Sequence, residues 1–186
     1  MRRRAPWLVV AVALAGVVAF VITRIDLDHA IREVTLPLRH EDVILQQAQR
    51  WDLDPGLIAA VIYEESRFRD QTSHAGARGL MQITPDTADT VERLSGGETF
   101  EHEDLADAEL NIRYGTYYLN YLLELYGGNV VAALAAYNAG PTNVDAWGGS
   151  GLDPGDIRFE ETRDYVENVL ERRDEYRHNY AVELDL

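Results

Sequence analysis

Apolar residues recur at spacings of three and four along most of this chain from Glu41 onward, a pattern typical of amphipathic helices. Asp54-Pro55 and Thr84-Pro85 each place a capping side chain before a proline suited to a first helical turn. We expect helices over residues 41–51, 55–67, 107–126, 129–139, 141–147 and 160–179, with another beginning at residue 84. Strand patterns are scarce, so the predicted fold class is mainly α.

The N-terminus carries three consecutive arginines, residues 2–4, before an uncharged apolar run over residues 5–23. As a helix this run would span about 28 Å at roughly 1.5 Å per residue, close to the thickness of the bilayer's hydrocarbon core. The positive-inside rule leaves the arginines in the cytoplasm. We therefore predict an uncleaved transmembrane anchor. A cleaved signal peptide is the alternative, although the small-x-small pattern at residues 13–15 lies early in the run.

Composition excludes several classes of function. The 186 residues contain no cysteine, which rules out disulfides, thiolate catalysis and thiolate metal sites. All 17 basic residues are arginine, and the net charge of −15 would repel nucleic-acid phosphates, so nucleic acid is not an expected partner. The five histidines show no metal-ligand spacing. We expect neither a metal nor a cofactor.

A carboxylate near the end of an apolar helix, followed by a glycine-punctuated turn, lies between Glu65 and Gln82. Apolar burial penalises the charged form of a carboxyl group, so such a residue can stay protonated near neutral pH and donate its proton to a glycosidic oxygen. Gly76 and Gly79 permit turn geometry or close chain approach. Glu64 points about 100° away around the helix, so Glu65 is the candidate acid.

Two further motifs follow at characteristic spacings, Ala136-Tyr137-Asn138-Ala139-Gly140 and Glu161-Thr162-Arg163-Asp164-Tyr165-Val166. Together with the Glu65–Gln82 segment they resemble the catalytic domain of the soluble lytic transglycosylase (SLT) family. That family has a lysozyme-like helical fold, shared with goose-type lysozyme, and cleaves peptidoglycan. The resemblance covers about residues 41–180. It departs at Arg158, where the family usually has proline, which affects the expected shape of that loop.

The resemblance implies roles for individual residues. It makes Glu65 the catalytic acid, and it implies that the cleft and substrate contacts come from Ser66, Met81, Gln82, Tyr137, Asn138 and Glu161. We expect the Tyr137 hydroxyl to hydrogen-bond the catalytic carboxyl. Asn138 would hold the backbone or an N-acetyl group of the sugar, and Glu161 would lie along the cleft wall.

The resemblance also implies a reaction. Most glycosidases use two carboxylates, whereas these motifs supply one clear acid, Glu65. A lytic transglycosylase cleaves the MurNAc-GlcNAc β-1,4 bond without water and leaves a 1,6-anhydroMurNAc end, with one glutamate acting as acid and then as base. One alternative is a lysozyme-type hydrolase, with Asp70 or an acid of residues 98–109 as its second carboxylate. Another is a catalytically silent glycan-binding protein of the envelope.

The predicted organisation follows from these assignments. Residues 1–4 are cytoplasmic, 5–23 form the anchor, 24–40 a linker, 41–180 the catalytic domain and 181–186 a C-terminal tail. We expect a single-pass protein of the inner (cytoplasmic) membrane whose catalytic domain faces the periplasm or cell wall. Its expected partners are peptidoglycan glycan strands and the membrane, with cell-wall synthesis or secretion machinery as further candidates.

Overall fold

The computed structural model describes residues 14, 27, 30–96 and 102–186, and the chain divides into two units, Met1–Pro37 and Leu38–Leu186. In the first unit, residues 30–35 are helical, so the segment expected to be a simple linker contains helix. The predicted anchor over residues 5–23 lies outside the described residues, apart from Leu14. Within the part that is described, we find no helix both long and apolar enough to span a bilayer.

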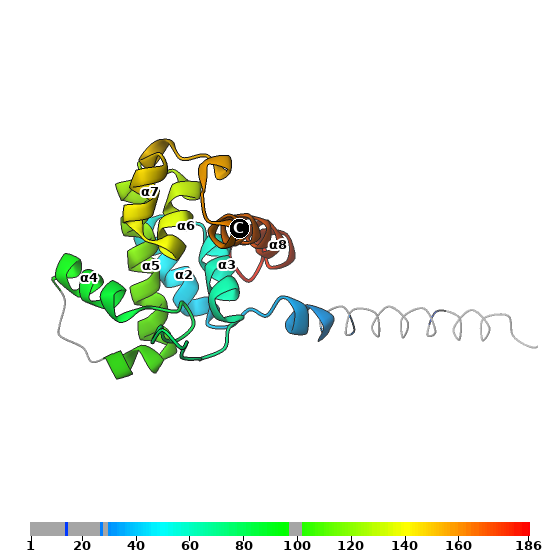
Figure 1. The fold of residues 1–186 in the computed structure, drawn as a ribbon. Coiled ribbons are helices and arrows are strands. Elements are labelled where there is room, and N and C mark those ends of the chain that lie inside the picture. Colours follow the sequence, from blue (N-terminus) through cyan, green and yellow to red (C-terminus); the bar gives the residue numbers. More distant parts are fainter. Residues whose placement is uncertain (1–13, 15–26, 28–29, 97–101) are drawn as a thin grey trace, which may run out of the picture. The chain divides into compact units, whose positions relative to one another are not determined.

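The second unit is built from helices, as the sequence predicts (Figure 1). They are α2 (Glu41–Trp51), α3 (Pro55–Ser66), α4 (Pro85–Ser95), α5 (Ala108–Leu125), α6 (Val130–Ala139), α7 (Pro141–Trp147) and α8 (Glu160–Asn179). Short 3-10 turns lie between α4 and α5 and between α7 and α8: η1 (His102–Ala106), η2 (Gly149–Gly151) and η3 (Pro154–Asp156). The described residues contain isolated β-bridges but no extended strand.

Capping side chains explain where the helices begin. Four side chains accept hydrogen bonds from first-turn amides, those of Asp54, Thr84, Asp107 and Asn129. Each such bond satisfies a backbone N–H that has no partner within the helix. At the other end of α3, Arg67 adopts a left-handed conformation with φ of +53° and ends the helix. Helix α3 therefore ends directly after the turn that carries Glu65.

Two buried helices organise the core of the second unit. The alanine-rich segment over residues 132–136 of α6 is fully buried, because small side chains let α5, α7 and α8 approach it closely. Helix α3 is buried from Pro55 to Tyr63 and lies alongside α8 (Figure 1). Since its apolar residues lie against its neighbours, the acids at its end, Glu64 and Glu65, are held at the edge of the core.

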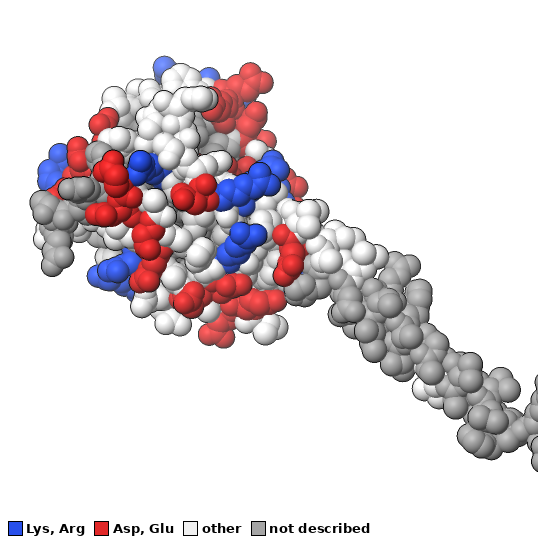
Figure 2. Space-filling model, turned by 90° about the horizontal axis from the view of Figure 1, so that it is seen from below, with Lys and Arg blue, Asp and Glu red and all other residues white. Residues whose placement is uncertain are grey.

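The surface is strongly acidic. On the face drawn in Figure 2, groups of acidic side chains surround isolated arginines. This agrees with the excess of 32 acidic over 17 basic residues in the chain. Acidic and basic residues are interspersed, so this face presents no continuous basic patch of the kind that binds nucleic acid.

Candidate active site

Glu65 lies in the last turn of α3, where α8 packs against it. The Tyr165 hydroxyl donates a hydrogen bond of 2.8 Å to Glu65 Oε1. Burial raises the pKa of Glu65 to about 7; the hydrogen bond from Tyr165 acts in the opposite direction, and the charge of Glu64 adds to the rise. A carboxyl group with this pKa can both donate and accept a proton near neutral pH.

Two hollows meet at Glu65. We call the first the α8 hollow; it has a volume of about 720 Å³ and is lined mainly by the ends of α3 and α8. The second, the turn hollow, has a volume of about 360 Å³ and is lined by residues of the 73–84 segment with α4, α5 and α6. Glu65, Asn138 and Glu161 line both, so the two hollows form one groove with Glu65 at the junction.

A buried asparagine on α5 shapes the turn that borders this groove. The Asn111 side chain accepts a hydrogen bond from Met81 N at 2.8 Å and donates to Arg78 O at 2.9 Å and Leu105 O at 3.0 Å. Gly79 has φ of +74°, and a Cβ atom there would lie 2.6 Å from Leu105 O. The turn therefore needs glycine at this position, as the sequence suggested, and Asn111 fixes its backbone.

The hydrogen bond expected from Tyr137 to the acid is made by Tyr165 instead. Tyr137 lies on α6 and faces the turn, where its hydroxyl donates to Met81 O at 2.9 Å. Tyr165 lies on the buried face of α8 that packs along α3, and so it meets Glu65. The third motif contained Tyr165, but only the pairing of α3 with α8 distinguishes between the two tyrosines.

Comparison with known proteins identifies the family of this chain. The family model described as Transglycosylase SLT domain matches residues 42–157. This chain belongs to that family. The soluble lytic murein transglycosylase of Salmonella typhimurium is 37% identical over 155 residues, which cover 78% of this chain and 24% of that protein. A solved structure of an inactive variant of lytic transglycosylase Slt from Pseudomonas aeruginosa superposes with a TM-score of 0.75 at 33% identity, covering 81% of this chain and 26% of that one.

Relatives of this SLT domain include both soluble and membrane-bound enzymes. The membrane-bound lytic murein transglycosylase C of Edwardsiella ictaluri is 32% identical over 136 residues, covering 62% of this chain and 38% of that protein. This chain spans about a quarter of the length of the soluble relatives it matches. The similarity is therefore to one domain of those larger proteins.

Two predicted substrate residues of the SLT domain lie in its core. Ser66 is buried, and its hydroxyl donates to Ile62 O at 3.1 Å, one turn earlier in α3. Met81 is fully buried, and a Cβ added to Gly115 would come within 2.7 Å of Met81 Cβ. Neither residue lines either hollow, and substrate contact by these side chains stays a prediction.

Three other predicted residues of the SLT domain line the groove. Gln82 has φ of +48°, and its Nε2 donates to Gly79 O at 2.8 Å and to Gln71 O at 3.1 Å. Asn138 accepts a hydrogen bond of 2.8 Å from the Thr162 hydroxyl and is exposed. Glu161 is exposed in the first turn of α8. These side chains border the space next to Glu65, and Tyr137 lines the turn hollow beside them.

Carboxylates are concentrated along one arm of the groove. The α8 hollow is lined by five of them, Glu64, Glu65, Glu160, Glu161 and Asp164. Asp70, the second carboxylate considered for a hydrolase, is exposed and lines neither hollow. Within the described ranges no cluster of histidine and acidic side chains is arranged to hold a metal ion.

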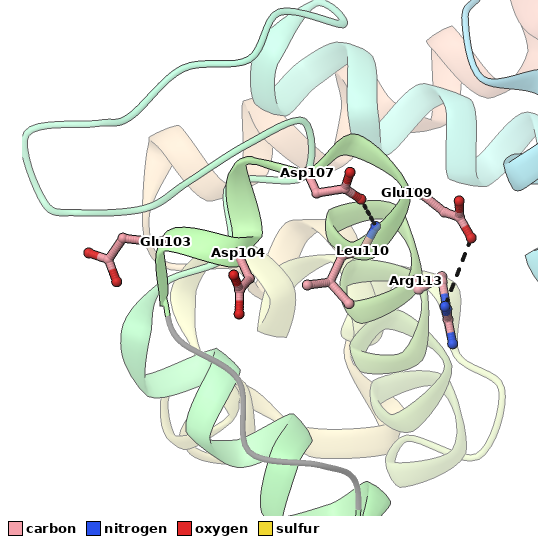
Figure 3. Close-up of a pocket in the computed structure, with 6 residues that line it drawn as sticks. All are labelled: Glu103, Asp104, Asp107, Glu109, Leu110 and Arg113. Carbon is pink, nitrogen blue, oxygen red and sulfur yellow. Dashed lines mark hydrogen bonds and ion pairs between the residues drawn. The ribbon is translucent and has the colours of Figure 1, made fainter.

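A separate acidic hollow lies at the start of α5 and shares no lining residue with the groove (Figure 3). Its lining residues are Glu103, Asp104, Asp107, Glu109, Leu110 and Arg113. Asp107 accepts a hydrogen bond from Leu110 N, and Glu109 forms an ion pair of 3.9 Å with Arg113. Asp107 thus serves as a helix cap, and Glu109 forms an ion pair one helical turn apart. These two roles explain two of the carboxylates in this hollow.

Proposed function

We propose that this chain is a peptidoglycan lytic transglycosylase that cleaves the MurNAc-GlcNAc β-1,4 bond without water. The observation that carries the proposal is Glu65, a half-buried carboxyl group with a pKa of about 7 at the junction of two hollows. Membership of the SLT family supports it. So do the names of its relatives, which are lytic murein transglycosylases.

In the proposed reaction Glu65 acts twice. Protonated Glu65 gives its proton to the glycosidic oxygen as the C1–O bond breaks, and the substrate's own N-acetyl group stabilises the anomeric carbon. The substrate's 6-hydroxyl then attacks that carbon and passes its proton to the Glu65 carboxylate. The new C1–O6 bond gives a 1,6-anhydroMurNAc end, and the enzyme returns to its starting state without consuming water.

The remaining groove residues have supporting roles in this proposal. Tyr165 orients the Glu65 carboxyl through its hydrogen bond, and Gln82, Asn138 and Glu161 contact the sugar chain. Tyr137, on α6, fixes the backbone of the turn through its hydrogen bond to Met81 O. Ser66 and Met81 act from the core as packing residues behind the groove.

We further propose that residues 5–23 anchor the protein in the inner membrane, with the catalytic domain on the periplasmic or cell-wall side. The apolar run flanked by arginines supports this orientation. The existence of a membrane-bound relative also supports it. An anchored enzyme would act on glycan strands close to the membrane, where cell-wall synthesis or secretion machinery would be its neighbours.

A lysozyme-type hydrolase is the second candidate, and one observation favours it. Glu161 lines both hollows together with Glu65, so it is a carboxylate in a position to activate a water molecule. In that case Glu161→Gln would abolish cleavage as completely as Glu65→Gln. A lytic transglycosylase would keep most of its turnover in Glu161→Gln.

The test uses the full chain, purified in detergent and incubated with peptidoglycan sacculi, with released fragments identified by mass spectrometry. We expect fragments lighter by one water than hydrolytic products and resistant to borohydride reduction. Glu65→Gln should release none, whereas Glu109→Gln, the same change in the separate acidic hollow, should behave as the original chain. Reducing fragments would establish the hydrolase instead, and no fragments from a folded chain would contradict both enzyme proposals.

A further inference from the structure

Arg172 lies on the same face of α8 as Tyr165, seven residues and about two helical turns further on. Because α8 runs along α3, the two side chains meet consecutive residues of α3. Tyr165 contacts Glu65. Arg172 Nε lies 3.6 Å from Glu64 Oε1. One face of α8 thus contacts both the proposed catalytic carboxyl group of Glu65 and the carboxylate of Glu64 next to it.

The guanidinium of Arg172 is held in place from several sides. It lies over the ring of Tyr63, with Cζ 4.4 Å from the ring centroid, and it also pairs with Glu175 one turn later in α8. The Arg172 and Glu64 side chains are only 25% and 18% exposed. An ion pair shielded to this degree is screened less by salt and water than a surface pair. Removing one partner would leave the other charge poorly solvated.

We propose that Arg172 is a positioning residue that holds and neutralises the Glu64 carboxylate, so that Glu65 can both release and regain its proton at neutral pH. This inference rests on the proposed function, in which Glu65 must act as acid and then as base. An uncompensated negative charge on Glu64 would favour the protonated form of Glu65. Glu65 would then hold its proton more tightly and be a weaker acid for the first step.

The charged and titratable groups around Glu65 come from each element packed against it. Helix α8 contributes Tyr165, α6 contributes Tyr137, and α3 contributes Glu64, to which Arg172 of α8 is paired. The remaining groups on the walls are the acids Glu160, Glu161 and Asp164 in the α8 hollow and Tyr118 from α5 in the turn hollow. Arg172 is the only cation in this described set, so it is the group able to offset the surrounding negative charge.

Burial lowers the pKa of Arg172, but the charges of Glu175, Tyr63 and Glu64 outweigh this and raise it overall, so the guanidinium stays charged throughout the working range. Its effect on Glu65 is therefore constant across neutral pH. Loss of the positive charge should raise the pKa of Glu65 above its present value of about 7. We expect a rise of about one unit, because Glu64 and Glu65 are consecutive residues of α3 in a partly buried site.

The test measures the pKa of Glu65 directly, in the full chain, by NMR titration of ¹³C-labelled glutamate carboxyl groups, with the signal assigned from Glu65→Gln. Arg172→Gln should raise this pKa by about one unit. Glu64→Gln should lower it, because one negative neighbour is removed. The double variant Glu64→Gln/Arg172→Gln should titrate close to Glu64→Gln alone, because Arg172 acts through Glu64.

Three comparisons keep the test specific. Arg113→Gln removes an equal charge from the separate acidic hollow and should leave the titration unchanged. Arg172→Lys keeps the charge and should restore most of the original pKa, even if its packing on Tyr63 is poorer. The alkaline limb of kcat/KM against pH, measured on sacculi, should move with the NMR value, since it reports the acid of the free enzyme.

The outcomes separate this inference from the proposed function. An unchanged Glu65 pKa in folded Arg172→Gln would overturn the inference. So would a double variant whose Glu65 pKa exceeds that of Glu64→Gln by as much as Arg172→Gln exceeds the original chain. Should Arg172→Gln fail to fold, Arg172→Lys and Glu64→Gln decide instead, and a Glu65 pKa that does not fall in Glu64→Gln overturns it. A shifted pKa in a chain that releases no glycan fragments would support the pairing and contradict the proposed enzyme.

Discussion

Glu65 combines two environments that oppose each other. Burial at the end of α3 favours its neutral form, while the hydrogen bond from Tyr165 stabilises its anion. The balance leaves the pKa at about 7, between the range of an ordinary carboxyl group and that of a fully buried one. The same buried position raises the pKa of Tyr165 well above its usual value, first by desolvation and then by the charge of Glu65, so the hydroxyl remains a donor.

Replacement of Glu65 by glutamine should stabilise the fold at alkaline pH. The pKa of Glu65 is about 7 when folded and 4.5 in an unperturbed chain, so the folded state binds the proton more tightly and stability falls as pH rises from 4.5 to 7. Above pH 7 the buried anion costs at most about 3 kcal/mol. Urea unfolding at pH 4 and pH 8 should show Glu65→Gln gaining stability over the original chain only at pH 8. An equal difference at both pH values would contradict this assignment.

At the scale of elements, the groove depends on a contact between α5 and the 71–83 turn. Asn111 is fully buried and joins its own helix to Met81 N and Arg78 O, which lie 30 and 33 residues earlier in the chain. The Tyr137 hydroxyl adds a second tie from α6 to Met81 O. The turn that carries Gln82 is thus held between two helices, in addition to the hydrogen bonds within it.

Substitution of Asn111 by alanine should destabilise the domain by about 3 kcal/mol, because a buried amide and two carbonyl groups lose their partner. The measurement is the free energy of unfolding in urea, together with cleavage of sacculi. Activity should fall further than stability explains, since the groove loses its shape. Asn120→Ala on the same helix is the matched control; it loses a hydrogen bond to Glu124 one turn later and should cost less than about 1 kcal/mol. Equal costs for the two variants would contradict a clamping role.

The sequence was sufficient for the features that local patterns determine. The spacing of apolar residues and the caps at Asp54, Thr84, Asp107 and Asn129 located the helices to within one or two residues. It was insufficient where distant segments meet. The choice of Tyr165 over Tyr137, the role of Asn111 and the burial of Met81 depend on which helices pack together, and no local spacing contains that information. The SLT resemblance identified candidate site residues, but the contacts of these residues depend on how the helices pack.

The molecule as a whole carries a net charge of −15, and several groups of acidic side chains lie on the face seen in Figure 2. Self-repulsion of like charges disfavours the compact state and is reduced by salt. The acids of the α8 hollow add to this field near the groove. Glycan strands that carry acidic peptides would therefore approach more easily when the charge is screened.

Raising NaCl from 50 mM to 500 mM should raise the melting temperature of the chain by a few degrees, because the Debye length falls to less than half and surface repulsion is screened. The measurement is thermal unfolding by circular dichroism at pH 8, where Glu65 is ionised. Substitution of three exposed acids, Glu109, Glu167 and Glu171, by glutamine should reduce this salt effect. A melting temperature that is independent of salt would show that the surface charge has no net effect on stability.

The hydrogen bond between Tyr165 and Glu65 joins residues 100 positions apart, and the second of them lies on the last helix. Because ribosomes make proteins from the N-terminus, α3 emerges well before α8. A nascent or truncated chain that stops before α8 carries the carboxyl group of Glu65 without the tyrosine that orients it or the helix that buries it. The groove is therefore completed only after α8 has emerged, so a chain that stops before α8 lacks the buried, hydrogen-bonded form of the proposed proton donor.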